Sequence, residues 1–280
     1  MGRTEYEVSR IGFGGAPAGL KNYLRSYSAE SSKSQEEIEL AIEEALIQGI
    51  NYFDTAPGYG DGLSERLLGK GLQKARKSVF LATKVRLMDS DLMKKSLENS
   101  LERLNTDYLD LVQIHGISYS KEQADEILSP GGTLDSLENL KNEGLTRFIG
   151  FTSEDNNEAV YRFIESERFD VMQICYNFAF QHPYVPSRPF GCLYEAEQRD
   201  MGIVAMRTPT SGTFQKWIQM VNPQNTFDYT GALIQFVLSN PVIDVALIGM
   251  RTPARVKQNV KLSENLDGRI DIGELYKWYV

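Results

Sequence analysis

The sequence predicts an α/β fold of the (β/α)8 TIM-barrel type, on three observations: short apolar segments recur along the chain, helical segments separate them, and there are eight of each. The chain has 280 residues, near the length of about 250 residues that is typical of this barrel. A doubly wound sheet is the alternative, because alternation by itself does not distinguish a closed sheet from an open one. No linker, low-complexity segment or repeat divides the chain, so residues 1–280 are expected to form a single domain.

The eight apolar segments are too short for helices and are rich in residues that favour strands. Their apolar residues are continuous rather than alternating, which is typical of parallel strands buried on both faces. The predicted strands are Ile11–Gly14, Ile50–Phe53, Val79–Lys84, Tyr108–Ile114, Arg147–Phe151, Val171–Tyr176, Ile203–Met206 and Val245–Ile248.

Helical segments lie between these strands, and several carry capping signals. A capping box is expected at Ser34, where a helix begins that ends before Gly49. Asp155 is expected to cap a later helix, and Thr252 with Pro253 gives a cap followed by an N1 proline. The predicted helices are Ser34–Ile47, Ser64–Lys74, Asp91–Leu104, Leu134–Glu143, Asn156–Ser166, Leu193–Gln198, Tyr229–Leu238 and Pro253–Leu262.

Composition and charge exclude several classes of protein. With 41% hydrophobic and 24% charged residues the chain is an ordinary globular one. Its net charge of −8 argues against nucleic-acid and anionic-membrane partners. No apolar run reaches the roughly 18 residues of a membrane-spanning helix, and the N-terminus lacks the core of a signal peptide, so the cytoplasm is the expected location. Two cysteines and two histidines at unrelated spacings predict no metal site.

Four polar side chains are expected at the C-terminal ends of neighbouring strands, where a barrel builds its binding site. Asp54, Lys84 and His115 end the second, third and fourth strands, and Tyr59 lies five residues after Asp54 in a loop. Each residue alone has an ordinary structural explanation, such as a helix cap, a solvated cation, loop packing or a core histidine. Burying unpaired polar groups at the ends of apolar strands is unfavourable, so their convergence favours a functional site.

The chemistry of these four residues indicates proton transfer at a carbonyl group. A tyrosine has a pKa near 10, and the ammonium of Lys84 is expected to lower the pKa of Tyr59. Asp54 would keep Lys84 charged and in place, and a neutral His115 could donate a hydrogen bond to a substrate carbonyl. Tyr59 would then protonate the carbonyl oxygen as a hydride arrives at the carbon.

At these residues the sequence resembles the aldo-keto reductase family. The resemblance extends from Ile11 to about Ser263 and is carried by the segments Phe53–Gly60, Ser64–Gly69, Leu81–Lys84 and Asp107–His115. It implies a (β/α)8 barrel that reduces an aldehyde or ketone to an alcohol, or catalyses the reverse. It also implies Tyr59 as the general acid–base, Lys84 and Asp54 as the pair that tunes it, and His115 as the residue that orients the carbonyl.

The resemblance further implies NADPH as the cofactor, with NADH less favoured, and no metal. The residues implied at the nicotinamide are Gly14, Gly15, Ala16, Thr152, Ser153 and Gln173. Two departures from the family stand out. Thr152-Ser153 replaces the frequent Ser-Asn, and Met206-Arg207 stands where many members place an aromatic residue over the nicotinamide. Packing of Met206 or a contact from Arg207 would replace that stacking.

The adenosine end of the cofactor is implied at the start of the last helix. A helix N-terminus after a glycine turn attracts an anion, and two arginines there could clamp a 2′-phosphate. The residues implied are Gly249, Met250, Arg251, Thr252, Arg255, Gln258 and Asn259, with Arg251 and Arg255 on the phosphate and the last two at the adenine. The segment Thr208–Gly212 would lie along the pyrophosphate, which adds Thr208 and Gly212.

The substrate is a small carbonyl or alcohol whose identity stays open, as do the direction of the reaction and the choice between monomer and homo-oligomer. Residues 16–33 and 177–190 form two long loops expected to shape the pocket. Their candidate pocket residues are Tyr23, Arg25, Tyr27, Phe178, Phe180, Tyr184, Arg188 and Phe190. A small residue at Gly116, next to His115, suggests an open mouth on that side, and the tail after Ser263 could dock on the barrel or reach the pocket.

Two other functions fit the same residues. The chain could be a cofactor-binding regulatory subunit without significant turnover, although all four acid–base positions are intact. Lys84 could instead form a Schiff base in an aldolase, although that reaction has no use for the segment Arg251–Asn259.

Overall fold

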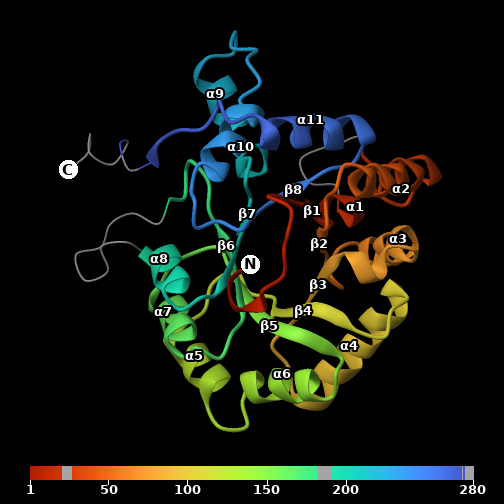
Figure 1. Ribbon diagram of the computed structural model, residues 1–280, viewed down its shortest axis with the longest axis vertical. Coiled ribbons are helices and arrows are strands. Elements are labelled where there is room, and N and C mark those ends of the chain that lie inside the picture. Colours follow the sequence, from red (N-terminus) through yellow and green to blue (C-terminus); the bar gives the residue numbers. More distant parts are fainter. Residues whose placement is uncertain (21–26, 182–190, 273, 275–280) are drawn as a thin grey trace.

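The eight predicted strands form one closed parallel barrel in the computed structural model, which describes residues 1–280 except 21–26, 182–190, 273 and 275–280 (Figure 1). They follow chain order, and β1 pairs with both β2 and β8 to close the barrel. The strands are β1 (Ile11–Gly14), β2 (Tyr52–Asp54), β3 (Phe80–Val85), β4 (Leu109–Ile114), β5 (Thr146–Ser153), β6 (Val171–Cys175), β7 (Gly202–Met206) and β8 (Val245–Gly249). Closure rules out the open doubly wound sheet.

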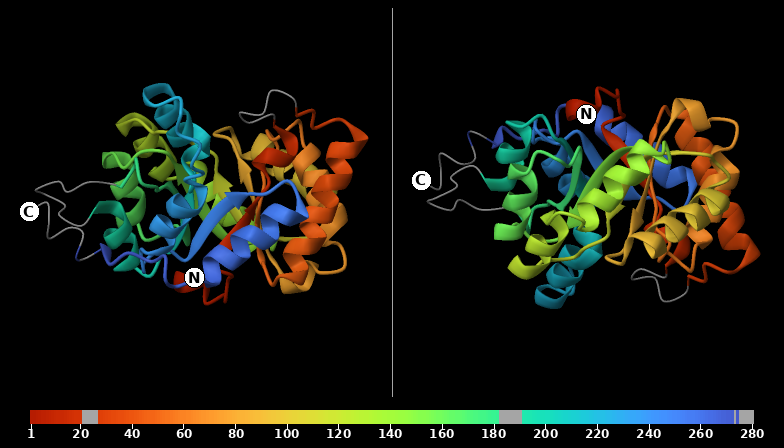
Figure 2. Two further views of the ribbon diagram at one scale, coloured as in Figure 1. Left: turned by 90° about the horizontal axis from the view of Figure 1, so that it is seen from above. Right: turned by 90° about the horizontal axis from the view of Figure 1, so that it is seen from below.

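Helices surround the barrel, with α2 and α3 on one side and α7 and α8 on the opposite side (Figures 1 and 2). The described α-helices are α1 (Ala16–Gly19), α2 (Ser32–Ile47), α3 (Leu63–Leu72), α4 (Ser90–Leu104), α5 (Lys121–Leu128), α6 (Thr133–Asn142), α7 (Glu158–Glu165), α8 (Gly191–Glu197), α9 (Thr213–Val221), α10 (Thr230–Leu238) and α11 (Pro253–Glu264). Short 3-10 turns lie at η1 (Gly2–Thr4), η2 (Arg76–Ser78) and η3 (Thr210–Gly212).

All eight predicted helices are present, but two predicted caps are wrong. The side chain of Ser31, rather than that of Ser34, caps α2, because Ser31 is the extended residue before the first turn and accepts from Ser34 N. Asn157 rather than Asp155 caps α7 for the same reason. The cap of α11 at Thr252 with Pro253 at N1 is confirmed.

Three described helices, α1, α5 and α9, were not predicted from the sequence. Helix α1 is a single turn, and α9 contains no buried residue, so its apolar periodicity does not mark a buried face. Helix α5 does carry a sequence signal, because Ser120 and Gln123 form a reciprocal capping box at its start.

The interior of the barrel is apolar except near the C-terminal ends of its strands. The buried side chains Tyr52, Phe80, Ala82, Leu111, Val171, Val204, Val245 and Leu247 fill it. Met1, Tyr6 and Val8 pack against this cluster, and Arg3 N donates to Asp200 O just before β7 begins. The N-terminal segment therefore covers the N-terminal end of the barrel and leaves the C-terminal end as the polar one.

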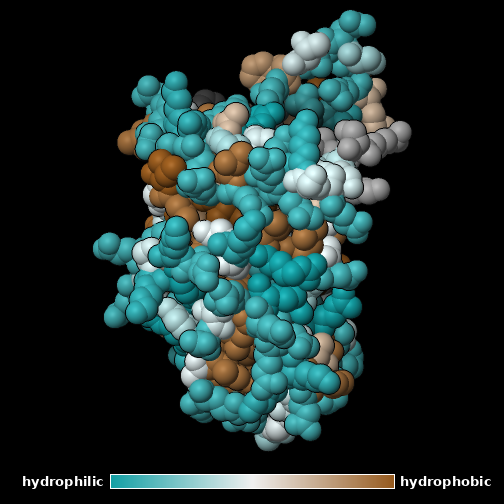
Figure 3. All heavy atoms as spheres, turned by 90° about the vertical axis from the view of Figure 1, so that its right-hand side faces the viewer, coloured by the Kyte–Doolittle hydropathy of each residue, from teal (hydrophilic) through white to brown (hydrophobic). Residues whose placement is uncertain are grey.

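The outer face over α2 and α3 is mostly hydrophilic, with a few apolar side chains scattered over it (Figure 3). Ile47 on α2 is an exposed apolar side chain, and single exposed apolar residues are normal on a protein surface. Across residues 1–20, 27–181, 191–272 and 274, none of the helices combines the length and apolarity needed to cross a membrane. The same residues include no cluster of His, Cys, Asp or Glu that could hold a metal ion.

Candidate active site

Three neighbouring strands bring the predicted catalytic residues together at the C-terminal end of the barrel. Asp54 is the last residue of β2, Lys84 is the next to last of β3, and His115 directly follows β4. Lys84 lies opposite Gln113 in the β3–β4 register. Tyr59 comes from the loop after β2, whose turn is closed by backbone bonds such as Tyr59 N to Ala56 O at 3.1 Å. Parallel strands thus place residues far apart in sequence at one mouth.

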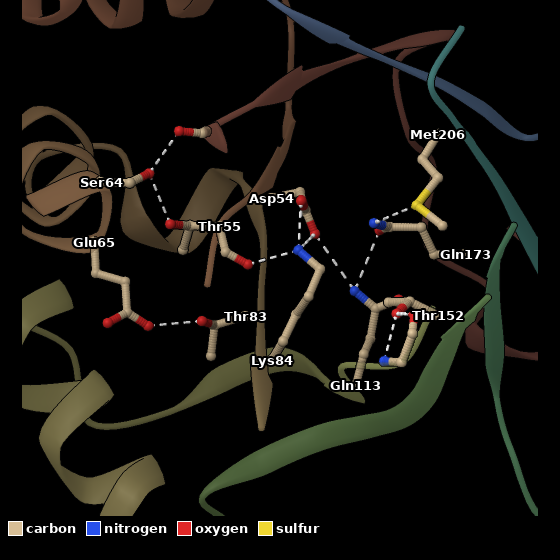
Figure 4. Close-up of polar contacts among 12 residues, drawn as sticks. Asp54, Thr55, Ser64, Glu65, Thr83, Lys84, Gln113, Thr152, Gln173 and Met206 are labelled. Carbon is tan, nitrogen blue, oxygen red and sulfur yellow. Dashed lines mark hydrogen bonds and ion pairs between the residues drawn. The ribbon is translucent and has the colours of Figure 1, made fainter. Parts of the chain in front are cut away.

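Asp54 and Lys84 form a buried ion pair (Figure 4). Lys84 Nζ lies 2.7 Å from both carboxylate oxygens and 2.7 Å from Thr55 O, and both side chains are at most 2% exposed. Burial raises the pKa of Asp54, against the attraction of Lys84. Burial acts to lower the pKa of Lys84, but attraction to Asp54 and Tyr59 outweighs it and the pKa is raised. Lys84 is therefore an ammonium at neutral pH.

Tyr59 lies between this cation and His115. Lys84 Nζ is 4.9 Å from the centroid of the Tyr59 ring, and the rings of Tyr59 and His115 meet edge to face with centroids 5.9 Å apart. Burial raises the pKa of Tyr59, and the charge of Lys84 only partly offsets this. Lys84 acts to lower that pKa, as expected, but the loss of water outweighs the nearby ammonium and the net shift is upward.

His115 is held neutral. Burial lowers its pKa to about 4, and the positive charges of Lys84 and Arg86 add to the effect. At neutral pH the imidazole therefore has one N–H donor and one acceptor nitrogen, which agrees with the neutral His115 expected from the sequence.

A chain of amides crosses the barrel next to the ion pair (Figure 4). Gln113 Nε2 lies 3.4 Å from Asp54 Oδ2 and 3.3 Å from Gln173 Oε1, and Gln173 Nε2 lies 3.8 Å from the sulfur of Met206. Sequence reasoning missed Gln113. The signal was available: in β4 the inward-facing positions run Leu111 then Gln113, so a polar side chain occupies an interior position two residues before His115.

The first residues of the segment Ser64–Gly69, on α3, form hydrogen bonds with residues next to the ion pair (Figure 4). Thr55 Oγ1 donates to Ser64 Oγ at 2.8 Å, and Ser64 Oγ donates to Gly15 O at 2.9 Å. The buried carboxylate of Glu65 accepts from Thr83 Oγ1 at 2.7 Å and from Arg103 Nε at 2.6 Å. These bonds fix the backbone on both sides of the ion pair.

The residues implied on β5 are engaged with the protein itself. Thr152 Oγ1 donates to Gly116 O at 2.7 Å and accepts from Gly116 N at 3.0 Å, while Ser153 Oγ donates to Asp155 O at 2.9 Å. The expected opening beside Gly116 is also wrong. The hydroxyl of Tyr119 fills the place that a side chain at Gly116 would take, and it donates to Thr152 O at 2.9 Å.

The segment after β7 is strained and lies over the mouth. Arg207 has a φ of 56° and forms an ion pair with Glu154 at the end of β5. Thr208 Oγ1 donates to Leu247 O at 3.0 Å, which ties the segment to β8. Thr210 and Ser211 also have positive φ angles, as does Gly212. Several non-glycine residues in this conformation are unfavourable, and such strain clusters at functional sites.

The glycines implied at the nicotinamide line the junction of β1, β2 and β8. Gly14 pairs with both Asp54 and Gly249, and Gly15 N donates to Asp54 O at 2.7 Å. A side chain on Gly15 would collide with Ser64 and with the backbone of Asp54. Ala16 begins α1 directly after them.

At the start of α11 the two implied arginines are used differently. Arg251 donates to Pro17 O at 2.9 Å and Leu20 O at 2.8 Å, and its guanidinium lies 3.9 Å from the Tyr27 ring centroid. Arg255 is exposed and donates to Gln258 Oε1 at 2.8 Å. Of their neighbours, Met250 and Asn259 are buried and Gly249 is exposed.

The pocket loops are described only in part. Tyr23, Arg25, Tyr184, Arg188 and Phe190 lie outside the described residues, as does the tail 275–280. Phe178 is half exposed and packs edge to face on Phe214 and Phe236, and Phe180 is half exposed as well. Tyr27 packs on Arg251 rather than facing the acid–base group.

Comparison with known proteins finds a family model and relatives that match most of the chain. The model of the aldo/keto reductase family matches residues 10–231. L-galactose dehydrogenase of Arabidopsis thaliana is 29% identical, with 95% of this chain and 88% of that protein aligned. D-threo-aldose 1-dehydrogenase of a Pseudomonas species is 25% identical, with 91% and 89% aligned.

A solved structure shows the same fold. The aldo/keto reductase of Klebsiella pneumoniae, crystallised with NADP and acetate, superimposes with a TM-score of 0.71 over 97% of this chain and 92% of its own. At 23% sequence identity this likeness establishes the barrel fold. The cofactor and the substrate have to be inferred from the residues of the site.

Proposed function

Because this chain belongs to the aldo/keto reductase family of oxidoreductases, we propose that it interconverts a carbonyl and an alcohol with NADPH as cofactor and Tyr59 as the general acid–base. One observation carries the proposal: a buried Lys84–Asp54 pair lies against the ring of Tyr59, which in turn meets a neutral His115. Each member of that set has a use in protonating a carbonyl oxygen.

Tyr59 acts as the acid in the direction of reduction. Burial raises its pKa, so the hydroxyl carries its proton at neutral pH and can give it to the carbonyl oxygen. As the proton leaves, the ammonium of Lys84 stabilises the developing phenolate. Asp54 keeps Lys84 charged, and in the direction of oxidation the same phenolate accepts the proton.

His115 orients the carbonyl rather than exchanging protons. A pKa of about 4 leaves it neutral across the physiological range. Its N–H can donate to the carbonyl oxygen that also meets Tyr59, so both donors converge on the atom where negative charge develops.

The residues of the site suit a nicotinamide cofactor. The amide nitrogen of Gln173 is directed at the thioether of Met206, a weak acceptor, so a carboxamide oxygen would be a better partner. Gly14 and Gly15 pack directly against β2 and β8, where a Cβ would meet Ser64, Asp54 or Ile248, so their lack of side chains lets this junction close beside the ion pair. Bound NADPH supplies the hydride that adds to the carbonyl carbon. Arg255, exposed near the N-terminus of α11, would hold the 2′-phosphate.

Three residues implied at the cofactor need revised roles. The guanidinium of Arg251 already binds Pro17 and Leu20, so we assign it to holding α1 in place. The hydroxyls of Thr152 and Ser153 are taken by backbone oxygens. We therefore assign the carboxamide chiefly to Gln173.

We propose an aldose as the substrate. The support is that two relatives aligned over about nine-tenths of this chain carry the names of aldose dehydrogenases. The partly exposed pair of Arg207 after β7 and Glu154 after β5 carries hydrogen-bond donors and acceptors of the kind that hydroxyl groups need.

The Schiff-base reading of Lys84 has less support. A nucleophilic lysine needs a lowered pKa, whereas the pKa of Lys84 is raised and its nitrogen donates to Asp54 and Thr55. A regulatory subunit without turnover would keep the cofactor residues, but it would have no need of the intact acid–base group.

The deciding experiment is a fluorescence titration of the protein with NADPH and NADH, followed by turnover assays of aldoses with NADP+ or NAD+ and of aldoses, simple aldehydes and ketones with NADPH or NADH. Tight NADPH binding with turnover of aldoses supports the full proposal, and turnover of simple carbonyls alone removes the aldose assignment. Tight binding without turnover favours the regulatory subunit. Binding of neither nucleotide overturns the proposal.

A further inference from the structure

Gln113 is a buried residue that contacts both Asp54 of the acid–base pair and the side-chain amide of Gln173, which we assign to the cofactor. It is fully buried on β4, and its Nε2 lies 3.4 Å from Asp54 Oδ2 and 3.3 Å from Gln173 Oε1 (Figure 4). The side chain of Gln173 also hydrogen-bonds to Asp54, which acts to lower the pKa of that carboxyl, so the two amides and the carboxylate form one cluster. Gln113 thus forms a bridge from β2 to β6 through the barrel.

The charge on Asp54 fixes the orientation of the Gln113 amide. Both oxygens of Asp54 accept from an ammonium, so Asp54 is a carboxylate and can only accept a hydrogen bond. Turning the Gln113 amide over would aim its carbonyl oxygen at Asp54 and Gln173 Oε1, two acceptors. The structure avoids this although Gln113 Oε1 then stays buried without a partner among the described residues.

The orientation of Gln113 in turn fixes that of Gln173. Gln113 offers Gln173 an N–H, so Gln173 must present its oxygen to the barrel interior. Its nitrogen lies 3.8 Å from the sulfur of Met206, a weak acceptor that a better one can replace. Gln173 is thereby poised as a donor toward the mouth.

We propose that Gln113 is a positioning residue that transmits the charge of Asp54 to Gln173 and so presents the Gln173 amide as a donor to the nicotinamide carboxamide. This rests on the proposed function, because it assumes that the nicotinamide is bound at this site. The Lys84–Asp54 pair and the amide of Gln173 are then parts of one hydrogen-bonded unit. A substitution at one end is expected to change the hydrogen bonding at the other.

The test compares two nucleotides that differ only in the nicotinamide. NADP+ and 2′-phospho-ADP-ribose share the adenosine, phosphates and ribose, so a defect confined to the carboxamide contact weakens only NADP+. Gln113→Met keeps the length of the side chain and removes its donors. We expect its affinity for NADP+ to fall about tenfold, the value of one good buried hydrogen bond, with that for 2′-phospho-ADP-ribose unchanged.

Two further variants keep the test decisive if Gln113→Met folds poorly. Gln113→Glu shares a proton with Asp54, so it donates there and turns an acceptor toward Gln173. It should show the same selective loss of NADP+ affinity. In Gln173→Met, adding Gln113→Met should cause no further loss, because Gln113 acts through Gln173.

Gln235 provides the matched control. It is another buried glutamine, on α10, and its Nε2 donates to Leu262 O at 2.8 Å and Asn265 O at 3.0 Å, away from the mouth. Gln235→Met should change the affinity for neither nucleotide. Equal losses for both nucleotides in Gln113→Met, or no loss for either, would overturn the inference. If the unaltered protein binds neither nucleotide, the proposed function itself fails and the inference falls with it.

Discussion

The ammonium of Lys84 lies 2.7 Å from both carboxylate oxygens of Asp54, inside a barrel whose interior is apolar toward the N-terminal ends of its strands. A buried ion pair seldom adds net stability, because desolvating two charges offsets their attraction. Its place beside Tyr59 gives it a use in catalysis instead. We therefore interpret the Lys84–Asp54 pair as serving the reaction rather than the stability of the fold.

Removing the carboxylate of Asp54 should lower the stability of the folded protein. Asp54→Asn leaves Lys84 buried without its anion, and we expect the free energy of unfolding to fall by about 3–5 kcal/mol. Lys84 then loses the attraction that raises its pKa, so the folded variant holds that proton less tightly than the unfolded chain. Its stability should rise with pH through the alkaline range relative to the unaltered protein.

Denaturant unfolding at several pH values measures both effects. Asp125→Asn is the control, because Asp125 is 56% exposed in its pair with Arg162 and should have no measurable influence. A difference between Asp54→Asn and the unaltered protein that does not vary with pH would contradict the argument.

Tyr59→Phe should abolish most turnover and leave the cofactor affinity nearly unchanged. The substitution removes the proton donor but keeps the ring that packs against Lys84 and His115. Loss of a general acid lowers rates by about 100-fold or more. Steady-state kinetics with a fluorescence titration of NADPH checks this, and turnover near that of the unaltered protein would eliminate Tyr59 as the acid.

Removing Arg251 and Arg255 together should weaken the binding of NADPH far more than that of NADH. From the contacts of the two arginines, we expect Arg255 to account for this selectivity. Arg255→Gln removes the exposed guanidinium near the start of α11, so we expect about a tenfold or greater loss for NADPH and little change for NADH. Arg251→Gln removes bonds to Pro17 and Leu20, so we expect lower stability and similar effects on both nucleotides.

Parallel titrations of the two single variants with NADPH and NADH test this division. A selective loss of NADPH in Arg251→Gln with none in Arg255→Gln would reverse the two roles. Equal losses for both nucleotides in the double variant would refute a 2′-phosphate site.

His115 should make the fold less stable in acid. The unfolded chain protonates a histidine near pH 6.5, whereas the folded protein does so only near pH 4. Between these values the unfolded state binds the extra proton, so stability falls as the pH falls, by up to about 3 kcal/mol. His115→Asn should lack this component.

The measurement is the free energy of unfolding of both proteins at several pH values from neutral to about pH 4, taken as a difference so that the carboxylates cancel. A difference that stays constant with pH would show that His115 titrates normally. NMR of the imidazole offers a direct check, since the chain has 2 histidines.

Local features of the sequence were enough to predict the barrel and its acid–base group. The eight strands follow from apolar runs of the right length, and Asp54, Lys84 and His115 stand out because each is polar at the end of such a run. Parallel strands place their C-terminal ends together, so strand order alone predicts that these residues meet. The single-domain organisation and the cytoplasmic location stay predictions.

Tertiary structure decided what depends on partners distant in sequence. Gln113 gains its significance from Asp54 and Gln173, which lie 59 and 60 positions away, and Arg251 is bound by Pro17, 234 positions away. The direction of the Tyr59 pKa shift depends on how much water burial removes, set against the charge of Lys84. The sequence names the ionisable groups, but burial and pairing, which set their energies, exist only once the chain is folded.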